Sequence, residues 1–524
     1  MNVANNDRFG LDRFDFRDLF VLDMANNHQG SVEHGVAVIR GLAEPVKRHG
    51  IRAGVKFQFR QLASFVHPSH RKDSDNKHIP RFLSTELKRA DYEVLLKEVK
   101  GSGMLSICTP FDEDSIDIIV EMGFDILKIA SCSAMDWPLL EKAANANLPI
   151  ICSTGGLEQR NIDELASFFY HRGVTVAFMH CVAIYPTPDE LLNLNQIAEM
   201  KKRYPYCTIG WSTHEDQDNT AAVQVAHAKG AAMFERHVGL ETETIKLNAY
   251  SSTPEQLDRW FAAYRQAVAM CGPAERPEAD PRERDALSSL QRGVYARKAI
   301  KKGAKLERGL VYFAMPILEG QLPSGQWSAE AVADAKVDAD GAVMLDAVTL
   351  PVPPKETSIK HSIHQVKALL NEAGVRLGSE FGVEYSHHEG IENFEQVGAV
   401  LIDCVNRSYC KKIVVQLPGQ NHPLHFHKIK EETFQVLWGT LEIEVDGHRK
   451  QLNPGDTCLV QPGVWHRFWS HTGCVFEEIS TRAIKGDSVY ADKRINAMEL
   501  SERKTVVDHW GRFQMKDGAL SWTT

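Results

Sequence analysis

The chain has 524 residues, and a prior of roughly 150 residues per domain predicts about three domains. Its composition, with 43% hydrophobic and 25% charged residues, is that of a globular protein, and a formal net charge of -9 argues against a surface built for nucleic acid or an anionic membrane. No apolar signal core is present in the N-terminal stretch MNVANNDRFGLDRFDF, and no apolar run is long enough to cross a bilayer, so we expect a cytoplasmic protein.

Eight short apolar or β-branched runs alternate with helical stretches between residues 16 and 272, which is the pattern of βα units. The runs are DLFVLD near 18, AGVKFQF near 53, MLSICTP near 104, DILKIAS near 125, LPIICST near 148, VTVAFMHC near 174, CTIGWS near 207 and AAMFERHV near 231. Eight such units in about 250 residues predict a (β/α)₈ TIM barrel, an α/β fold with its active site at the C-terminal ends of the strands. Cys108, Cys152 and Cys181 lie inside these runs and are expected to be small core residues rather than disulfide partners.

Polar residues gather at the ends of these eight runs, where a barrel would bring them together. They are Asp23, Asn27 and His28 after the first run, Lys56 and Gln58 in the second, Thr109, Lys128, Ser131 and Ser153 at the third to fifth, His180 and Tyr185 at the sixth, Ser212 and His214 at the seventh, and Glu235 and His237 at the eighth. A strand-end cap would explain any one of them. Eight consecutive strands that end in this way indicate a polar active site instead.

Two histidines on neighbouring strands, His214 and His237, are placed to converge on one divalent ion at the barrel mouth. Imidazole suits Mn²⁺, Fe²⁺, Co²⁺ or Zn²⁺ rather than Ca²⁺. Two protein ligands leave coordination positions open for a substrate carbonyl and water, which is the arrangement of a Lewis-acid catalyst.

Two lysines, Lys56 and Lys128, lie inside sheet runs, where a charged side chain is costly unless an anion or a carbonyl partners it. The residues alone leave three interpretations open. Each lysine could pair with a barrel carboxylate, form the Schiff base of an aldolase, or grip the phosphate and carboxylate of a substrate with help from nearby hydroxyls.

The barrel region resembles the sialic acid synthase family, also called N-acetylneuraminate synthases, through the ordered motifs NNHQGS, VKFQ, CTPFDE, LKIAS, STGG, HCVAIYPTP, IGWSTHE and FERHVG. The resemblance implies condensation of phosphoenolpyruvate (PEP) with an open-chain sugar aldehyde to a 3-deoxy-2-ulosonic acid, without a Schiff base. It implies that PEP is held by Lys56, Gln58, Thr109, Lys128, Ser131, Ser153 and Ser212. It further implies Mn²⁺ or a similar ion on His214 and His237, Tyr185 and Glu235 facing the sugar, and Asp23 managing a proton or orienting water.

Four positions depart from the family pattern. Asp23 stands where the family has Glu, and Ala183 stands where it has Asn. Asn248 replaces an acid near the sugar, and Met315 replaces an arginine that reaches the N-acyl sugar in a partner's active site. The positions for PEP and metal match the family and the acceptor positions do not. We therefore expect an acceptor other than N-acetylmannosamine.

Two further domains are predicted after the barrel, which ends near residue 272. A proline-rich and charged linker, CGPAERPEADPRERD, covers about 271 to 285. The β-rich segment 283–350, with SSLQRGVYARKAIKKGAKL, resembles the antifreeze-like (SAF) domain of the same family, which implies a homodimer with this domain over the partner's barrel. A second breaker, LPVPPKETS, precedes a predicted β-barrel at 360–524.

The last domain fits the cupin motif G-x5-H-x-H-x4-E-x6-G from Gly419 to Gly439, and PGDTCLVQPGVWH approximates the second cupin motif. Strand alternation puts His425 and His427 on one face, and Glu432 and His466 complete a site for a second divalent metal, whose identity is open. A metal-free sugar-binding barrel is the alternative.

The sequence around Lys430, HFHKIKEETFQVLWGTLEIEVDG, also resembles sugar cupins of the D-lyxose-isomerase type. Two functions therefore stay open for this domain: aldose–ketose isomerisation with proton transfer by Lys430, or sensing of a sugar or product. We favour binding and regulation, because cupin metal sites recur across many functions. For the whole chain the alternatives are a Schiff-base aldolase of 2-keto-3-deoxy acids and a non-catalytic sugar-binding scaffold.

Overall fold

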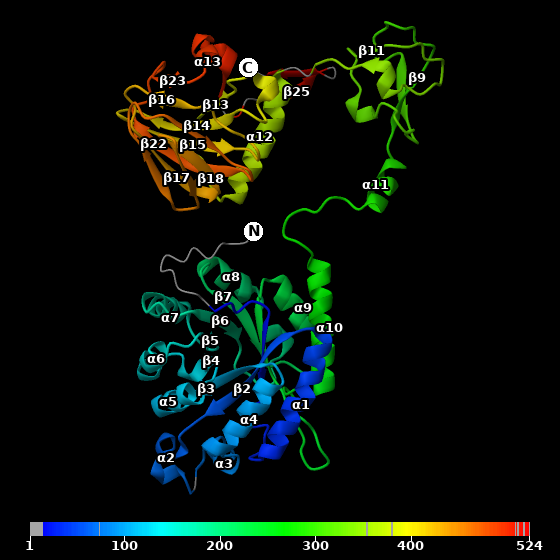
Figure 1. Cartoon of the computed structure of the whole chain (residues 1–524). Helices are drawn as coiled ribbons and strands as arrows, with labels where there is room; N and C mark the ends of the chain where they lie inside the picture. The colour runs from blue at the N-terminus through cyan, green and yellow to red at the C-terminus, as the bar shows by residue number, and fades with distance from the viewer. Residues whose placement is uncertain are drawn as a thin grey trace. The chain divides into compact units, whose positions relative to one another are not determined.

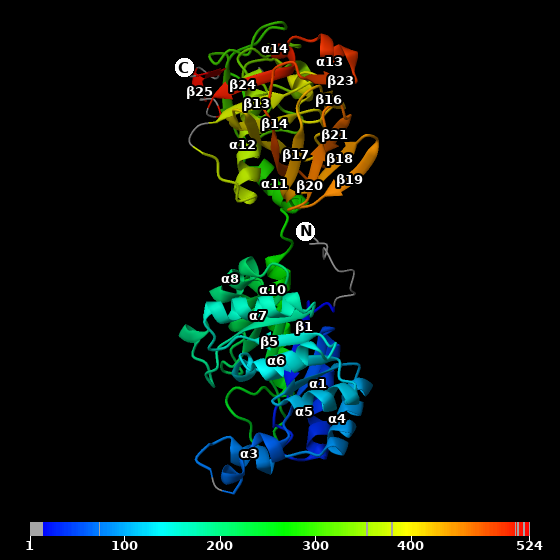
Figure 2. The same cartoon turned by 90° about the vertical axis from the view of Figure 1, so that its left-hand side faces the viewer.

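The computed structural model describes residues 14–72, 74–352, 355–378, 381–508, 510, 513–516 and 519–522. The N-terminal stretch up to residue 13, in which no signal core was expected, lies outside these residues. The chain divides into two compact units, Met1–Pro277 and Glu278–Thr524 (Figures 1 and 2), and each has its own hydrophobic core.

The first unit contains a closed barrel of eight parallel strands in sequential order. The strands are β1 (Leu19–Asp23), β2 (Arg52–Phe59), β3 (Leu105–Pro110), β4 (Ile126–Ile129), β5 (Ile150–Ser153), β6 (Val176–Cys181), β7 (Thr208–Thr213) and β8 (Met233–His237). Each coincides with one of the eight predicted runs, and only β2 and β7 extend beyond their run, by one residue each. β8 closes the barrel by pairing with β1, which places His237 opposite Asp23. The (β/α)₈ prediction is confirmed.

A helix follows each strand and covers the outside of the barrel. These helices are α1 (Val32–His49), α4 (Arg89–Gly101), α5 (Glu113–Met122), α6 (Trp137–Ala144), α7 (Gln159–His171), α8 (Asn195–Arg203), α9 (Ala221–Ala228) and α10 (Pro254–Cys271), with the short α2 (Leu62–Phe65) and α3 (Ile79–Ser84) between β2 and α4. Local sequence sets their ends. Ser31 accepts a hydrogen bond from the His34 amide at the start of α1, and Gly50 ends that helix in the left-handed conformation.

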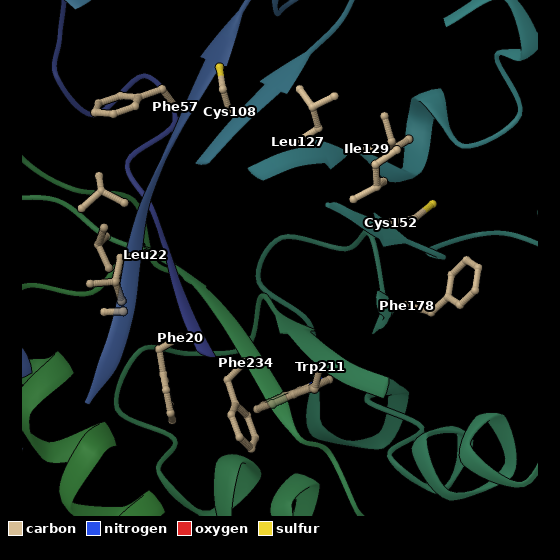
Figure 3. Close-up of a cluster of buried hydrophobic side chains, with 14 of the residues drawn as sticks. Phe20, Leu22, Phe57, Cys108, Leu127, Ile129, Cys152, Phe178, Trp211 and Phe234 are labelled. Atoms are coloured by element: carbon tan, nitrogen blue, oxygen red, sulfur yellow. The ribbon is translucent and has the colours of Figure 1, made fainter. Parts of the chain in front are cut away.

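Strand alternation divides the barrel side chains into two layers. Outward-facing residues such as Phe20 and Phe234 pack with the helices in one large core, part of which is drawn in Figure 3. Inward-facing residues such as Val21 fill the barrel interior. Because the alternation continues to the strand ends, Asp23 and Glu235 also face inward. The apolar interior thus ends in a layer of polar side chains at the barrel mouth.

The second unit begins with a β-rich portion that has its own apolar core. It contains two two-stranded sheets, formed by β9 (Gly293–Ala296) with β10 (Val311–Ala314) and by β11 (Val332–Ala333) with β12 (Val348–Thr349). The predicted linker includes a short exposed helix, α11 (Pro281–Ser288), which was not expected from its composition. Asp280 caps this helix and Pro281 occupies its first turn. The SAF assignment of this portion stays a prediction.

The C-terminal portion has two antiparallel sheets that face one another, as in a cupin barrel. One sheet has the order β20 (Thr457–Val460), β17 (Glu432–Gly439), β22 (Cys474–Thr481), β15 (Tyr409–Gln416), β14 (Ala399–Asn406), β13 (Gly382–Ser386) and β24 (Lys504–Asp508). The other has the order β19 (His448–Leu452), β18 (Leu441–Val445), β21 (His466–Trp469), β16 (His425–His427) and β23 (Ser488–Tyr490). Shorter elements follow: α13 (Lys493–Ala497), α14 (Leu500–Arg503), β25 (Phe513–Lys516) and β26 (Ala519–Trp522).

An 18-residue helix, α12 (Lys355–Glu372), precedes these strands and begins before residue 360, where strands and turns were predicted. The prediction missed the helical spacing of Ile359, Ile363, Val366 and Leu370, which are buried together against the strands. Prolines 353 and 354 of the predicted breaker lie outside the described residues. Among the helices that the structure describes, none combines the length and apolar character needed to cross a membrane.

Candidate functional site

Four charged side chains form a continuous chain across the inside of the barrel mouth. Lys56 Nζ lies 2.6 Å from Glu235 Oε1 and 3.0 Å from Asp23 Oδ2. Lys128 Nζ lies 3.1 Å from Glu235 Oε2 and donates a hydrogen bond to Ser153 Oγ. All four charged side chains are buried. Two ammonium groups and two carboxylates balance in charge, so each buried ion has a partner that compensates its loss of water.

These ion pairs shift the pKa of Lys56 and the pKa of Glu235. Burial alone would lower the pKa of Lys56, but the carboxylates of Asp23 and Glu235 more than offset it and raise that pKa above its ordinary value. Burial would raise the pKa of Glu235, but Lys128 and Lys56 hold it well below its ordinary value. Lys56 is therefore an ammonium ion, which binds anions, whereas a Schiff-base lysine must reach its neutral form.

His214 and His237 face one another at the mouth, with ring centroids 5.3 Å apart. His214 Nδ1 donates a hydrogen bond to the Val182 carbonyl at 2.9 Å, and His237 Nδ1 lies 3.2 Å from Asp23 Oδ2. Both partners favour the ring proton on Nδ1, which leaves Nε2 of each histidine with a free lone pair. Burial and the neighbouring His237 lower the pKa of His214 to about 3, and burial lowers the pKa of His237, so both rings are neutral near pH 7.

A divalent metal ion fits this pair of histidines. Two imidazoles on one ion, each about 2.1 Å from it, hold their rings about 5 Å apart, in agreement with the observed separation. An oxygen behind each ring is the usual means by which proteins orient metal-binding histidines. The structure therefore brings together the residues that the sequence proposed as the barrel metal ligands.

Hydroxyl groups lie beside the two lysines. Thr109 Oγ1 is buried and makes no hydrogen bond within the described residues. Ser131 accepts a hydrogen bond from a backbone amide at 3.0 Å, and the hydroxyls of Ser131 and Ser212 both contact the thiol of Cys181. Ser131, Ser153 and Ser212, predicted from three separate strands, thus each contact Lys128 or Cys181.

Of the residues proposed to face the sugar, Tyr185 and Asn248 lie nearer the solvent, whereas Glu235 is buried between the two lysines. Tyr185 is 50% exposed, and its ring centroid is 4.2 Å from that of His214 and 5.1 Å from that of Tyr250. Asn248 is half-buried, and its Oδ1 accepts a hydrogen bond from the Tyr250 amide at 3.2 Å. Asn248 thus supports the loop that carries Tyr250, and Tyr185 covers the histidine pair.

His180 and Cys181, which are neighbours on β6, face opposite sides of the barrel wall, and the sequence-based expectation for each was wrong or incomplete. His180 was grouped with the polar strand ends, but it faces outward and its Nε2 donates a hydrogen bond to the Leu192 carbonyl at 2.8 Å. Cys181, expected only as a core residue, faces inward, and its Sγ lies 3.9 Å from His214 Nδ1. The parity of each residue within β6 was the signal that distinguished them. Arg60, just after β2, was also overlooked.

In the second unit, four side chains of the cupin portion converge on one point. His425 and His427 lie on β16, Glu432 begins β17 and His466 begins β21. One ligand atom from each lies within 4.8 Å of the others, and all four residues are buried. These are the four ligands that the sequence proposed for the second metal.

The protonation of this cluster suits a cation. His425 Nδ1 donates a hydrogen bond to a backbone carbonyl at 2.9 Å, so its Nε2 carries a free lone pair. His466 Nδ1 lies 3.1 Å from a backbone carbonyl, and its Nε2 lies 2.8 Å from Glu432 Oε1. Burial lowers the pKa of His427 to about 4. Three imidazoles and one carboxylate form a donor set that matches a borderline divalent metal.

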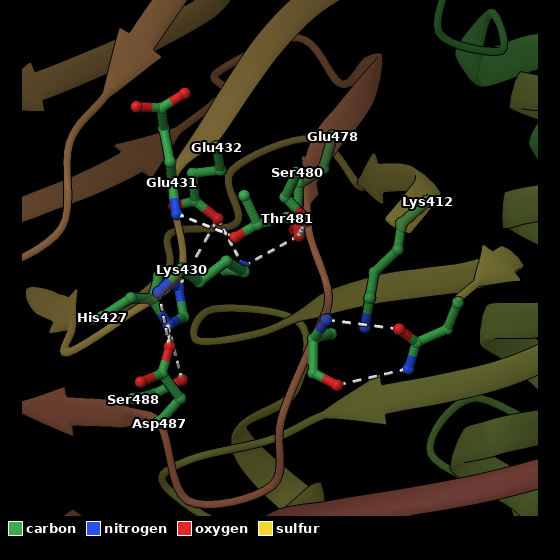
Figure 4. Close-up of polar contacts among 12 residues, drawn as sticks. Lys412, His427, Lys430, Glu431, Glu432, Glu478, Ser480, Thr481, Asp487 and Ser488 are labelled. Atoms are coloured by element: carbon green, nitrogen blue, oxygen red, sulfur yellow. Dashed lines mark hydrogen bonds and ion pairs between the residues drawn. The ribbon is translucent and has the colours of Figure 1, made fainter. Parts of the chain in front are cut away.

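Lys430 lies beside the ligands, between two carboxylates (Figure 4). Its Nζ pairs with Glu432 Oε2 and lies 2.8 Å from Glu478 Oε1. Burial would lower the pKa of Lys430, but Glu478 and Glu432 raise it above the ordinary value. Asp487, which the sequence analysis did not identify, accepts hydrogen bonds from the backbone amides of Ile429 and Lys430, each at 3.0 Å. Lys430 is thus a fixed cation in this position.

Comparisons with known proteins cover both site-bearing regions. Residues 46–276 match the model of the NeuB family, and residues 412–477 match that of the cupin domain. An uncharacterized protein of Methanocaldococcus jannaschii is 30% identical over 292 residues, which are 55% of this chain and 82% of that protein. The N-acetylneuraminate-9-phosphate synthase of Drosophila melanogaster is 25% identical over 338 residues, 58% of this chain and 87% of that enzyme. A crystal structure of a Chromobacterium violaceum protein assigned to spore coat polysaccharide biosynthesis is 43% identical with a TM-score of 0.62, and the match covers 64% of this chain and 100% of that one.

The cupin cluster should hold one divalent ion without help from the barrel. In a His237→Ala background, where only the cupin ion is counted, we expect full-length protein to keep about one Mn²⁺ or similar ion per chain after gel filtration. Adding His466→Ala should remove it, because one of four lone-pair donors is lost. Elemental analysis by mass spectrometry measures the content. The exposed His448→Ala serves as control, and equal metal content in folded His466→Ala protein would contradict the assignment.

Proposed function

This chain belongs to the NeuB family, and on that premise we propose that its barrel condenses PEP with the open-chain aldehyde of a sugar, giving a 3-deoxy-2-ulosonic acid and inorganic phosphate. The chain is a carbon–carbon bond-forming enzyme of the PEP-condensing class. The observation that supports the proposed reaction most directly is the pair of buried lysine cations beside two neutral histidines at one barrel mouth.

The two lysines would bind the anionic groups of PEP. Lys56 and Lys128 already share the carboxylate of Glu235, so an anionic substrate can join them without any change of protonation. Thr109 has a hydroxyl without a partner among the described residues, which leaves its proton free for a phosphate or carboxylate oxygen. The other proposed contacts come from Gln58, Ser131, Ser153 and Ser212.

The histidines would hold the metal. A divalent ion such as Mn²⁺, when bound there, supplies a Lewis acid that polarises the aldehyde oxygen. Asp23 stands behind His237 and keeps the lone pair of its Nε2 available, which makes Asp23 a positioning residue as well as a candidate to orient water. Tyr185, which lies beside His214, and Glu235, which lies within the charged chain, would contact the sugar.

The proposed reaction balances in bonds and protons. C3 of PEP forms the new bond to the aldehyde carbon, and the aldehyde oxygen takes up a proton to become a hydroxyl. Water adds to C2 and gives up one proton, which balances the proton taken up by the aldehyde oxygen. The new C2 hydroxyl passes its remaining proton to the departing phosphate as the bond between C2 and the phosphate oxygen breaks, which leaves a ketone. Asp23 contacts Lys56 and lies 3.2 Å from His237, so it is the buried carboxylate best placed to hold that water or its proton.

The acceptor is proposed to differ from N-acetylmannosamine. Ala183 offers only a methyl group, and Asn248 carries no charge and is engaged with the Tyr250 amide. Met315, at the position of the family arginine, is 59% exposed in the second unit, and we propose that in a homodimer it approaches the partner's barrel. These changes remove polar groups around an N-acyl sugar, which alters specificity because unpaired buried polar groups are costly.

The cupin portion is proposed to bind a divalent ion together with a sugar or product and to regulate the barrel. The fixed ammonium of Lys430 favours binding over isomerisation, because a proton relay needs a group that exchanges its proton near neutral pH. Isomerisation of an aldose is the second candidate, since the carboxylate of Glu478 lies 2.8 Å from Lys430 and close to the ligand set.

Release of phosphate from PEP tests the proposed reaction directly. With a panel of aldoses, we expect release to require a divalent ion and to fall by at least about 100-fold in His237→Ala, because the aldehyde loses its electrophile. Exposed His171→Ala should be unchanged. Borohydride with pyruvate should leave no adduct on Lys56 or Lys128, and a trapped adduct would instead establish the Schiff-base aldolase.

N-acetylmannosamine should be a poor acceptor. Losing two or more hydrogen bonds at about 1 to 3 kcal/mol each predicts a kcat/KM at least about tenfold below that of the best aldose in the panel. Asn248→Asp, which restores the family acid, should raise turnover of N-acetylmannosamine more than that of other sugars. Wild-type turnover of N-acetylmannosamine equal to the best acceptor would refute this expectation.

A further inference from the structure

Arg60 lies at the barrel mouth, immediately after β2, and the proposed binding of PEP and metal does not use it. It lines a pocket of about 300 Å³. The pocket is lined by the first strands of the barrel and the segments that follow them, including Asn26, Gln58 on β2, Thr85, and Tyr92 on α4. Gln58 is one of the residues proposed to hold PEP, so this pocket adjoins the proposed active site.

Two aromatic rings hold the Arg60 guanidinium. Its central carbon lies 4.0 Å from the ring centroid of Phe82 on α3 and 3.9 Å from that of Phe111, which follows β3. One terminal nitrogen donates a hydrogen bond to Gln58 Oε1 at 2.7 Å. The two rings cover the flat faces of the guanidinium, so its remaining donors are available only along its edge, the geometry in which arginine binds oxyanions.

Among the residues that the structure describes, the charge of Arg60 has no counter-ion. Within the described residues no carboxylate forms an ion pair with it, and its Nε is buried without a hydrogen-bond partner. Burial lowers the pKa of Arg60 to about 10, as expected for a cation that has lost water without gaining an anion. Arg89 on the same pocket rim differs, because it pairs with Glu121 at 2.8 Å and Glu93 at 3.4 Å. Burying an unpaired cation is unfavourable, which indicates that a bound anion pairs with Arg60.

We propose that Arg60 receives an anionic group of the acceptor sugar, a phosphate ester or a carboxylate. This inference rests on the proposed condensation, since it gives a substrate class to that reaction. PEP is already assigned Lys56, Lys128 and several hydroxyls, which leaves Arg60 for the second substrate. The same acceptor loses polar contacts at Ala183, Asn248 and Met315, so the balance of recognition shifts from an N-acyl group to an anion.

Direct binding tests the subsite without turnover. Full-length protein in EDTA, saturated with PEP to fill the PEP site, would be titrated by calorimetry with mannose 6-phosphate against mannose, and with glucuronate against glucose. We expect one anionic sugar to bind at least about tenfold more tightly than its neutral counterpart. The phosphate pair and the carboxylate pair decide which anion the pocket takes. Steady-state phosphate release with the same sugars and metal would show the same preference in kcat/KM.

Three variants isolate Arg60. Arg60→Met keeps a long side chain between the two rings and should reduce the preference to less than about threefold, and Arg60→Lys should restore part of it. Arg89→Met removes a cation from the same rim and should leave the preference intact. The proposal is overturned if Arg60→Met retains the preference, or if it raises the KM for PEP alone. Absence of phosphate release with every sugar would contradict the proposed reaction, and the calorimetry would still decide the subsite.

Discussion

The bridge that Glu235 makes between Lys56 and Lys128 is the interaction on which the barrel site depends. Two ammonium ions buried side by side would repel each other strongly, and the carboxylate of Glu235 between them offsets this repulsion. Asp23 contacts both Lys56 and His237, so the protonation of this proposed metal ligand depends on the same set of charged side chains. The site is therefore one electrostatic unit, in which an anionic substrate would find cations already charged and already held in place.

The two proposed metal sites use the same device for different ends. In each, an oxygen behind a histidine favours the ring proton on Nδ1 and leaves Nε2 free to bind a cation. The barrel offers two imidazoles at an open mouth, where a substrate can complete the coordination. The cupin offers three imidazoles and a carboxylate, all buried, with Lys430 locked beside them. In the proposed function, the first arrangement would serve catalysis and the second would serve binding.

Arg60 differs from the buried lysines, because no carboxylate among the described residues forms an ion pair with it. The buried lysines of the two sites, Lys56 and Lys128 in the barrel and Lys430 in the cupin portion, have carboxylates within 3.1 Å. Arg60 has two aromatic rings and an amide instead, which fix its direction without neutralising it. The proposed preference for an anionic acceptor and the lost polar groups at Ala183, Asn248 and Met315 then describe one change of substrate rather than several unrelated substitutions.

The sequence by itself determined the barrel, because eight apolar runs with helices between them have few other ways to bury their strands, and each run corresponds to one observed strand to within one residue. It also proposed both sets of metal ligands, since histidines at strand ends and at cupin spacing stand out by their order and parity, and the structure places the members of each set near one another. It missed α12, whose apolar spacing was hidden behind a proline-rich breaker, and it misplaced His180. Only the tertiary structure decided which charges meet. Asp23 and Glu235 are 212 positions apart in the chain, yet both contact Lys56, because β8 closes against β1. Closure of a barrel sets such distances through strand register, and a buried charge acquires its role from neighbours that sequence spacing does not reveal.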